Sequence, residues 1–117
     1  MSQFMLSVHH EPGVQAAGGA YETEEDAQTA FAAVGALNKQ LEKDGQLVFV
    51  GALNPPEVAA TASPDGQVVE GPVSDVVGRQ LGGFWIIDVP DRQTALAVAE
   101  HAAKACHQPV EVRQFEG

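Results

Sequence analysis

Basic residues are scarce in this chain. Six Lys and Arg stand against sixteen Asp and Glu, which gives a formal net charge of −10 over 117 residues. A nucleic-acid-binding protein needs a basic surface that displaces counterions from phosphates, and an anionic membrane repels a protein of this charge. We therefore expect neither nucleic acid nor a membrane among its partners, and we assign the excess of acids to solubility.

Cysteine and long apolar runs are also nearly absent. The single cysteine, Cys106, has no partner for an internal disulfide, so the chain has no disulfide framework of the kind found in small secreted proteins. No apolar run reaches the roughly 18 residues that span a bilayer. The N-terminal MSQFMLSVHH lacks the basic segment and the long apolar stretch of a signal peptide. These absences predict a cytoplasmic protein.

The motifs of common cofactor and metal sites are missing. There is no phosphate-binding loop and no dinucleotide fingerprint, and Ser7 lacks the Gly-x-Ser-x-Gly context of a hydrolase nucleophile. His9 and His10 are adjacent in a predicted strand, so their side chains point to opposite faces and make a poor metal clamp. His101 and His107 have no acid or cysteine at ligand spacing. The sequence indicates no cofactor and no metal.

The length of the chain fits a single domain, residues 1–117. Several of its segments have the residue pattern of β-strands. A weaker strand from Glu57 to Thr61 is predicted to pair as a hairpin with Gln67–Glu70, across a Ser-Pro-Asp-Gly turn. Four other segments have the apolar runs or alternation of strands, and these are residues 4–10, 47–53, 81–89 and 109–115.

Two helices are predicted from their caps and their apolar spacing. Thr23 precedes three acids, which favour the positive end of a helix, and apolar residues then recur every three and four positions. This pattern continues for about 20 residues, until Gly45 ends the helix. Asp91 is the expected cap of the second helix, which has an alanine-rich apolar stripe.

The order of these elements is β-α-β, a hairpin, then β-α-β. That order predicts a ferredoxin-like α+β fold, an antiparallel sheet with two helices on one face. The opposite face would carry Met5, Ser7 and His9, together with Phe84 and Ile86. Apolar side chains left in water are unfavourable at this scale. We therefore expect a homodimer in which the uncovered faces of two sheets enclose a barrel-like space.

The chain resembles the YCII-related proteins, and within them the DGPF-domain branch. The resemblance covers nearly the whole chain and includes the termini FMLSVHH and VEVRQF. It rests most on Glu70-Gly71-Pro72-Val73, where the branch has Asp-Gly-Pro-Phe, and on Gln80-Leu81-Gly82-Gly83-Phe84 and Ile87-Asp88-Val89-Pro90-Asp91. The resemblance implies a dimeric α/β barrel. Many such proteins are encoded beside sigma factors, and some relatives are suspected of catalysis through a His–Asp pair.

A pocket is expected on the uncovered face. The first strand should lie in the middle of the sheet, antiparallel to the strand at 81–89 and to the last strand. That arrangement places His9 near Gly82 and Gly83, and glycines in a central strand leave room for a ligand. Ser7 lies on the same face as His9 and is a candidate ligand-binding residue.

The polar stretch before the strand at 81–89 is interpreted as the lip of this pocket. It is expected to bring Glu70, Asp75 and Arg79 to the rim. Each residue has a structural alternative. His9 is suited to a dimer contact, Glu70 to a turn, and Asp75 and Arg79, four apart, to a salt bridge on a helical turn.

Three functions follow from this interpretation. The first is a small binding or accessory protein, with a regulatory and transcription-linked role implied by the resemblance. The second is an enzyme in which His9, with Glu70 as the acidic partner, performs general acid–base chemistry on a small organic substrate. The third is a role in protein interaction alone, which is favoured if close packing seals the uncovered face.

Overall fold

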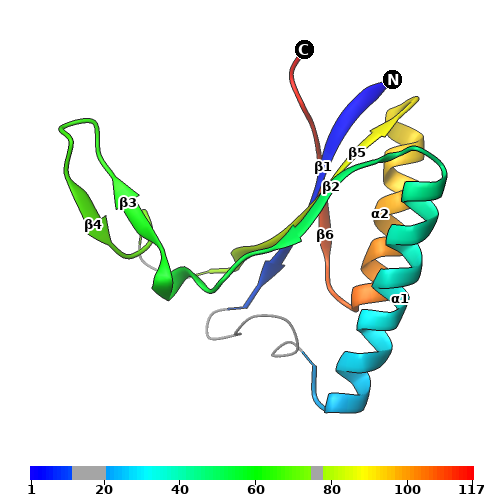
Figure 1. The fold of residues 1–117 in the computed structure, drawn as a ribbon, viewed down its shortest axis with the longest axis horizontal. Coiled ribbons are helices and arrows are strands. Elements are labelled where there is room, and N and C mark those ends of the chain that lie inside the picture. The colour runs from blue at the N-terminus through cyan, green and yellow to red at the C-terminus, as the bar shows by residue number, and fades with distance from the viewer. Residues whose placement is uncertain (12–20, 75–77) are drawn as a thin grey trace.

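A four-stranded antiparallel sheet forms the centre of the molecule (Figure 1). The computed structural model describes residues 1–11, 21–74 and 78–117. β1 pairs antiparallel with both β5 and β6, as predicted. The strand order is β2-β5-β1-β6, and the bounds are Ser2–His10 for β1, Leu47–Ala52 for β2, Gln80–Val89 for β5 and Val110–Gln114 for β6.

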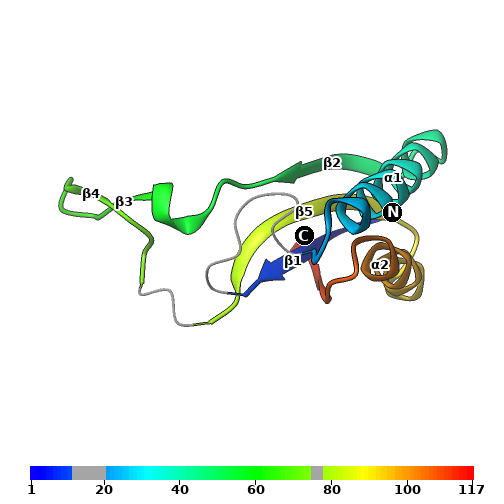
Figure 2. The same ribbon diagram turned by 90° about the horizontal axis from the view of Figure 1, so that it is seen from below.

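Two helices, α1 (Glu24–Lys43) and α2 (Arg92–Cys106), lie on the same side of this sheet (Figure 2). The Oγ1 atom of Thr23 accepts a hydrogen bond from the Asp26 amide at 3.0 Å. The Asp91 carboxylate accepts one from the Thr94 amide at 2.8 Å. Both helix starts predicted from the sequence are confirmed, because each cap satisfies an amide that has no partner within its own helix.

The core lies between the helices and the sheet. Alternate residues of β1 and β5 supply its large side chains, and the helices supply mainly alanines, which let them pack closely. The fully buried members include Leu6, Ile87, Val89, Ala95 and Ala102. The ferredoxin-like α+β fold predicted from the sequence is compatible with this arrangement of sheet, helices and hairpin.

A second, two-stranded sheet forms a hairpin arm that projects away from the main sheet (Figure 1). It consists of β3 (Ala60–Ala62) and β4 (Val68–Glu70), paired antiparallel. Pro56–Val58 form a short 3-10 helix in place of the first part of the predicted strand, because proline lacks the amide that a strand ladder needs. Val68 and Val69 are exposed, and such a hairpin is only marginally stable by itself in water.

Candidate functional site

The pairing of β1 with β5 shifts near the carboxyl end of β1. Val8 is opposite Gly83, but the next residue, His9, is opposite Leu81. Gly82 is therefore the extra residue of a β-bulge, and a bulge changes which face the neighbouring side chains occupy. Alternation along β1 keeps His9 on the uncovered face and points His10 toward the helices, and the bulge turns Gly82 to the helix side beneath His10.

The His10 imidazole occupies the space above Gly82. A Cβ atom at Gly82 would overlap the Cδ2 and Nε2 atoms of this ring. At Gly83 a Cβ would come within 3.0 Å of the Gly51 carbonyl oxygen. The double glycine thus makes room, as the sequence indicates, but the room above Gly82 is taken by His10 on the helix side and is not left open opposite His9.

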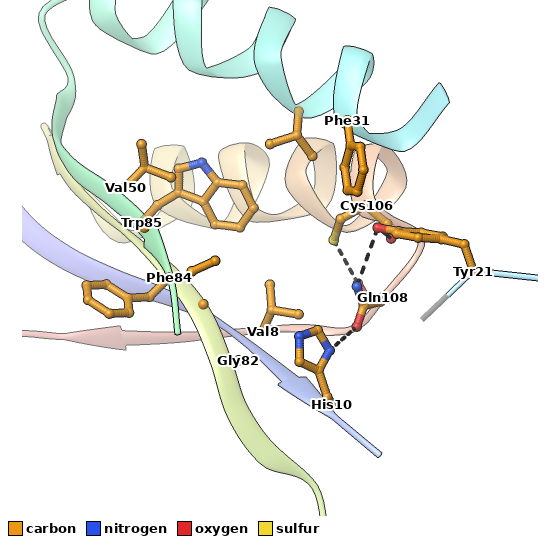
Figure 3. Close-up of a pocket in the computed structure, with 14 residues that line it drawn as sticks. Val8, His10, Tyr21, Phe31, Val50, Gly82, Phe84, Trp85, Cys106 and Gln108 are labelled. Atoms are coloured by element: carbon orange, nitrogen blue, oxygen red, sulfur yellow. Dashed lines mark hydrogen bonds between the residues drawn. The ribbon is translucent and has the colours of Figure 1, made fainter. Parts of the chain in front are cut away.

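A cavity of about 240 Å³ opens on the helix side of the sheet, beside His10 (Figure 3). We call it the helix-side cavity. The ends of β1, β2 and β5, the first half of α1 and the end of α2 form its walls. Most of the lining is apolar, including Val8, Phe31, Val34, Val50 and Trp85, and the polar side chains are His10, Tyr21 and Gln108. Its volume is below the roughly 300–1,000 Å³ of sites for drug-sized ligands, so it suits a smaller molecule.

The polar side chains of the helix-side cavity are joined by hydrogen bonds (Figure 3). The Tyr21 hydroxyl donates to the Cys106 carbonyl oxygen at 2.7 Å. The Gln108 amide nitrogen donates to the Tyr21 oxygen at 3.5 Å, and the Gln108 amide oxygen lies 2.7 Å from the Nδ1 atom of His10. The chain of bonds therefore runs from the end of α2 to the end of β1.

Burial determines the protonation of two groups at this cavity. Desolvation raises the pKa of the Tyr21 phenol above its ordinary value of 10.0, so its hydroxyl proton is retained. Desolvation also raises the pKa of the Cys106 thiol. A thiol is nucleophilic as its thiolate, so Cys106 is suited to packing against the cavity wall and poorly suited to covalent chemistry.

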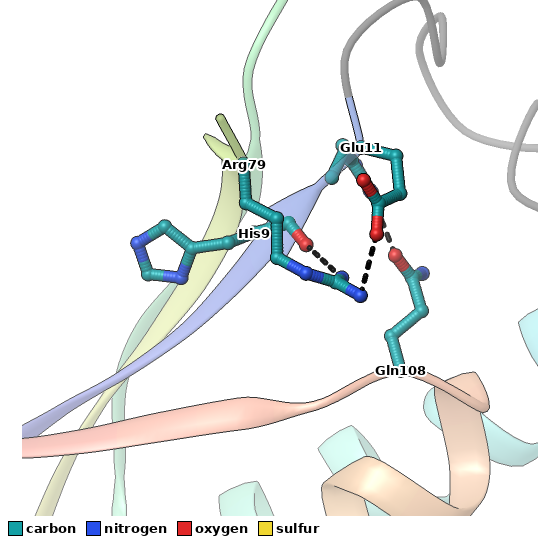
Figure 4. Close-up of polar contacts among 5 residues, drawn as sticks. His9, Glu11, Arg79 and Gln108 are labelled. Carbon is teal, nitrogen blue, oxygen red and sulfur yellow. Dashed lines mark hydrogen bonds and ion pairs between the residues drawn. The ribbon is translucent and has the colours of Figure 1, made fainter. Parts of the chain in front are cut away.

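His9 has different neighbours from His10. Its ring lies on the opposite side of β1 from Gln108 (Figure 4). Its backbone carbonyl accepts a hydrogen bond from Arg79 at 3.2 Å, and the same guanidinium forms an ion pair with Glu11 at 2.7 Å. Arg79 therefore meets His9 as expected, but through the His9 backbone, and Glu11 is an acidic partner of Arg79 that the sequence analysis did not single out.

The other predicted pocket residues are not gathered around His9 within one chain. Glu70 is exposed at the end of β4, on the hairpin arm. Asp75 lies outside the described residues. Ser7 is on the uncovered face, buried between its neighbours Phe84 on β5 and Glu111 on β6. Of the predicted set, the single chain therefore brings together His9, Arg79 and the backbone of the Gly82 bulge.

Apolar side chains remain on the uncovered face of the sheet, which we call the open face. Phe49 is 54% exposed. Ile86 is opposite both Phe49 and Met5, and Arg113 follows on β6. The Phe49 and Phe84 rings lie 5.8 Å apart. Within the described residues, no helix covers this group.

The described part of the chain has neither a metal-binding cluster nor a helix that could span a membrane. No group of three or more His, Cys, Asp and Glu side chains is placed to hold a metal ion there. Neither α1 nor α2, the longest helices of residues 21–74 and 78–117, combines the length and apolarity that crossing a membrane requires.

Comparison with known proteins identifies a family for this chain. No curated protein matches the chain. The model of the family described as "YCII-related domain" matches residues 2–116, which is nearly the entire sequence. The chain therefore belongs to the YCII-related domain family.

Proposed function

We propose that this protein binds a small, largely apolar molecule in the helix-side cavity. The observation that carries the proposal is the cavity itself, an apolar space of about 240 Å³ with one string of hydrogen-bonded polar groups at its edge. Apolar walls with a few oriented polar groups are the usual composition of a small-molecule site, in which the walls give affinity and the polar groups give orientation.

A filled cavity tests this proposal. Val50 lines the cavity, and Val48, two residues earlier on β2, is 52% exposed. We expect Val50→Phe to abolish the binding of single-ring aromatic molecules observed by NMR, and the matched Val48→Phe to leave it unchanged. If folded Val50→Phe binds the same molecules with the same affinity, the ligand site is elsewhere.

We also propose that the protein works as a homodimer joined through the open face. The exposed Phe49 and its neighbours Phe84, Ile86 and Met5 form an apolar group on this face, and burying a large apolar side chain contributes about 1.5–3 kcal/mol. The net charge of −10 per chain opposes association. Salt screens that repulsion, so the dimer should become tighter as ionic strength rises.

Sedimentation equilibrium tests the dimer. Phe49→Asp should shift the protein to the 12.3 kDa protomer, because it places a carboxylate in the proposed interface. Leu96→Asp is the control, since Leu96 is 41% exposed on α2, away from the open face. A wild-type protein that sediments as a protomer at high salt would contradict the homodimer.

The open face supports a second candidate, acid–base chemistry by His9. Proton transfer needs a histidine within hydrogen-bond reach of its partner in a site that excludes water. The His9 ring faces the surface through which the homodimer is proposed to form (Figure 4), and a second chain would supply the enclosure. The acidic partner in this candidate is Glu70 of the hairpin arm, reaching across from that second chain, with Ser7, Asp75 and Arg79 as binding residues.

Chemical modification tests the enclosure of His9 that the enzyme candidate requires. In the enzyme candidate, His9 is shielded in the dimer, so diethylpyrocarbonate should modify it more slowly in the wild type than in Phe49→Asp. Peptide mass spectrometry gives the rate at His9, with the exposed His101 as an internal control. Equal rates at His9 in both proteins would remove the enzyme candidate. In that case a role in protein interaction alone would use the hairpin arm, because its exposed valines suit a contact with another chain.

A further inference from the structure

The hydrogen bonds at the helix-side cavity have a single consistent direction. The Cys106 carbonyl oxygen can only accept, so the Tyr21 hydroxyl must donate its one proton to it, at 2.7 Å. The Tyr21 oxygen then accepts from its other neighbour, the Gln108 side chain, and this places the Gln108 amide nitrogen toward Tyr21. The Gln108 amide oxygen is left facing His10.

This direction decides the tautomer of neutral His10. The Gln108 amide oxygen can only accept, and it lies 2.7 Å from the Nδ1 atom, so Nδ1 must carry the proton. A neutral imidazole has one proton on its two nitrogens, so Nε2 has a free lone pair. No hydrogen bond to Nε2 is found among the described residues. The ring edge that carries Nε2 lies against Gly82, where an added Cβ would overlap Nε2, and Figure 3 shows the ring beside Val8 at the wall of the cavity.

We infer that the helix-side cavity selects a small, mostly apolar molecule that donates one hydrogen bond, and that the Nε2 atom of His10 accepts it. The inference rests on the proposed ligand site and adds the chemical class of the ligand. Gln108 and Tyr21 are positioning residues, because they act by holding the His10 tautomer. Phenols, anilines and small N–H heterocycles have this chemistry, with one apolar ring and one donor.

Anionic ligands fit this site less well. None of the described residues that line the cavity is Lys or Arg. A carboxylate would bring its oxygens against the lone pair of His10 Nε2, and two acceptors repel each other. The chain's net charge of −10 adds to this repulsion. The geometry therefore separates neutral donors from carboxylates of similar size.

Phenol, anisole and benzoate form a matched set of probes. Each has one ring, but only phenol is a neutral donor. NMR titration of the wild-type protein should show phenol binding about 2- to 10-fold more tightly than anisole, from one net hydrogen bond, and benzoate binding most weakly. Equal affinity for phenol and anisole would overturn the inference and leave the proposed ligand site standing. Binding of none of the three would overturn both.

The tautomer gives a test that needs no ligand and no variant. Nitrogen-15 spectra of the wild-type protein, with the imidazole neutral, should show Nδ1 of His10 protonated and Nε2 unprotonated. The reverse pattern would overturn the inference. Gln108→Leu removes the acceptor that holds Nδ1–H, so it should mix the two tautomers and reduce the preference for phenol over anisole. Gln108→Asn, which keeps an amide, is the conservative comparison. It should retain more of the Nδ1–H tautomer and more of the preference for phenol than Gln108→Leu does.

Discussion

The two faces of the central sheet differ in how much of their apolar surface the chain itself covers. On the helix side, Leu6 and Ile87 are fully buried under α1 and α2. On the open face, Phe49 is 54% exposed and Ile86 is only partly buried. Both faces come from the same strands, since side chains alternate between them. Stability within one chain should therefore depend mainly on the helix side, and association on the open face.

The adjacent residues Ile86 and Ile87 give the largest contrast between the faces. Ile87→Ala should lower the free energy of unfolding by about 2–5 kcal/mol, because it leaves a cavity in the core. Ile86→Ala should lower it much less at concentrations where the protomer predominates, and should weaken the dimer instead. Urea unfolding at low concentration measures the first effect, and sedimentation measures the second. Equal losses of stability would mean that a single chain covers both faces.

The bulge at Gly82 brings this residue against the His10 ring on the helix side of the sheet. A methyl group added at Gly82 tests that contact. Gly82→Ala should lower the free energy of unfolding by about 1–3 kcal/mol, or expel the His10 ring, because the added Cβ overlaps that ring. Gly78→Ala is the matched control, since a Cβ there meets no atom of the described residues within 4 Å. Urea unfolding and the His10 ring resonances report the two results. An unchanged protein would contradict the placement of His10.

The helices that cover the sheet can also be strengthened. Gly35 lies inside α1, and a Cβ at this position would meet no atom within 4 Å among residues 1–11, 21–74 and 78–117, apart from the backbone of its own helix. Gly35→Ala should therefore raise the free energy of unfolding by about 0.5–1 kcal/mol, because alanine loses less backbone entropy in a helix. Thermal unfolding measures this gain. A loss of stability would show that α1 packs more closely at Gly35 than the structure indicates.

The cap of α2 gives the smallest effect, and it depends on pH. Hydrogen bonds from the Thr94 hydroxyl and amide lower the pKa of Asp91 below its ordinary value of 3.8. A carboxyl with a lowered folded-state pKa stabilises the fold above its unfolded-state pKa, and this contribution is lost as pH falls through the folded value. Asp91→Asn keeps a capping oxygen without the charge. The small stability difference between wild type and Asp91→Asn should therefore shrink below pH 3.8. A difference that is constant with pH would contradict the assigned pKa direction.

The fold was largely predictable because its signals are local. Thr23 and Asp91 are caps followed at once by helical spacing, and the strand at 81–89 is a strongly apolar run between turn residues. The main departure is at Pro56, where consecutive prolines favour a 3-10 helix. The hairpin arm shows what local signals do not predict. Its pairing follows from the turn between its strands, but its position away from the main sheet does not.

The candidate site was less predictable, because it depends on residues far apart in sequence. His10 and Gln108 are 98 positions apart and Tyr21 and Cys106 are 85 apart, and no spacing in the sequence links these residues. The double glycine was predicted to leave room for a ligand opposite His9, but the space above Gly82 is occupied by His10, because of a bulge that depends on the pairing of two strands. A search for the polar residues nearest the ends of predicted strands and helices would have included His10 and Gln108.

The aromatic side chains around the helix-side cavity have a practical consequence. The protein has one tryptophan and one tyrosine, and both Trp85 and Tyr21 line this cavity. The Trp85 indole donates a 2.6 Å hydrogen bond to Asn38 on α1, so its emission is sensitive both to the seating of that helix and to anything that enters beside it. The unlabelled protein is therefore its own fluorescent reporter, with both intrinsic fluorophores at the place where occupancy is in question.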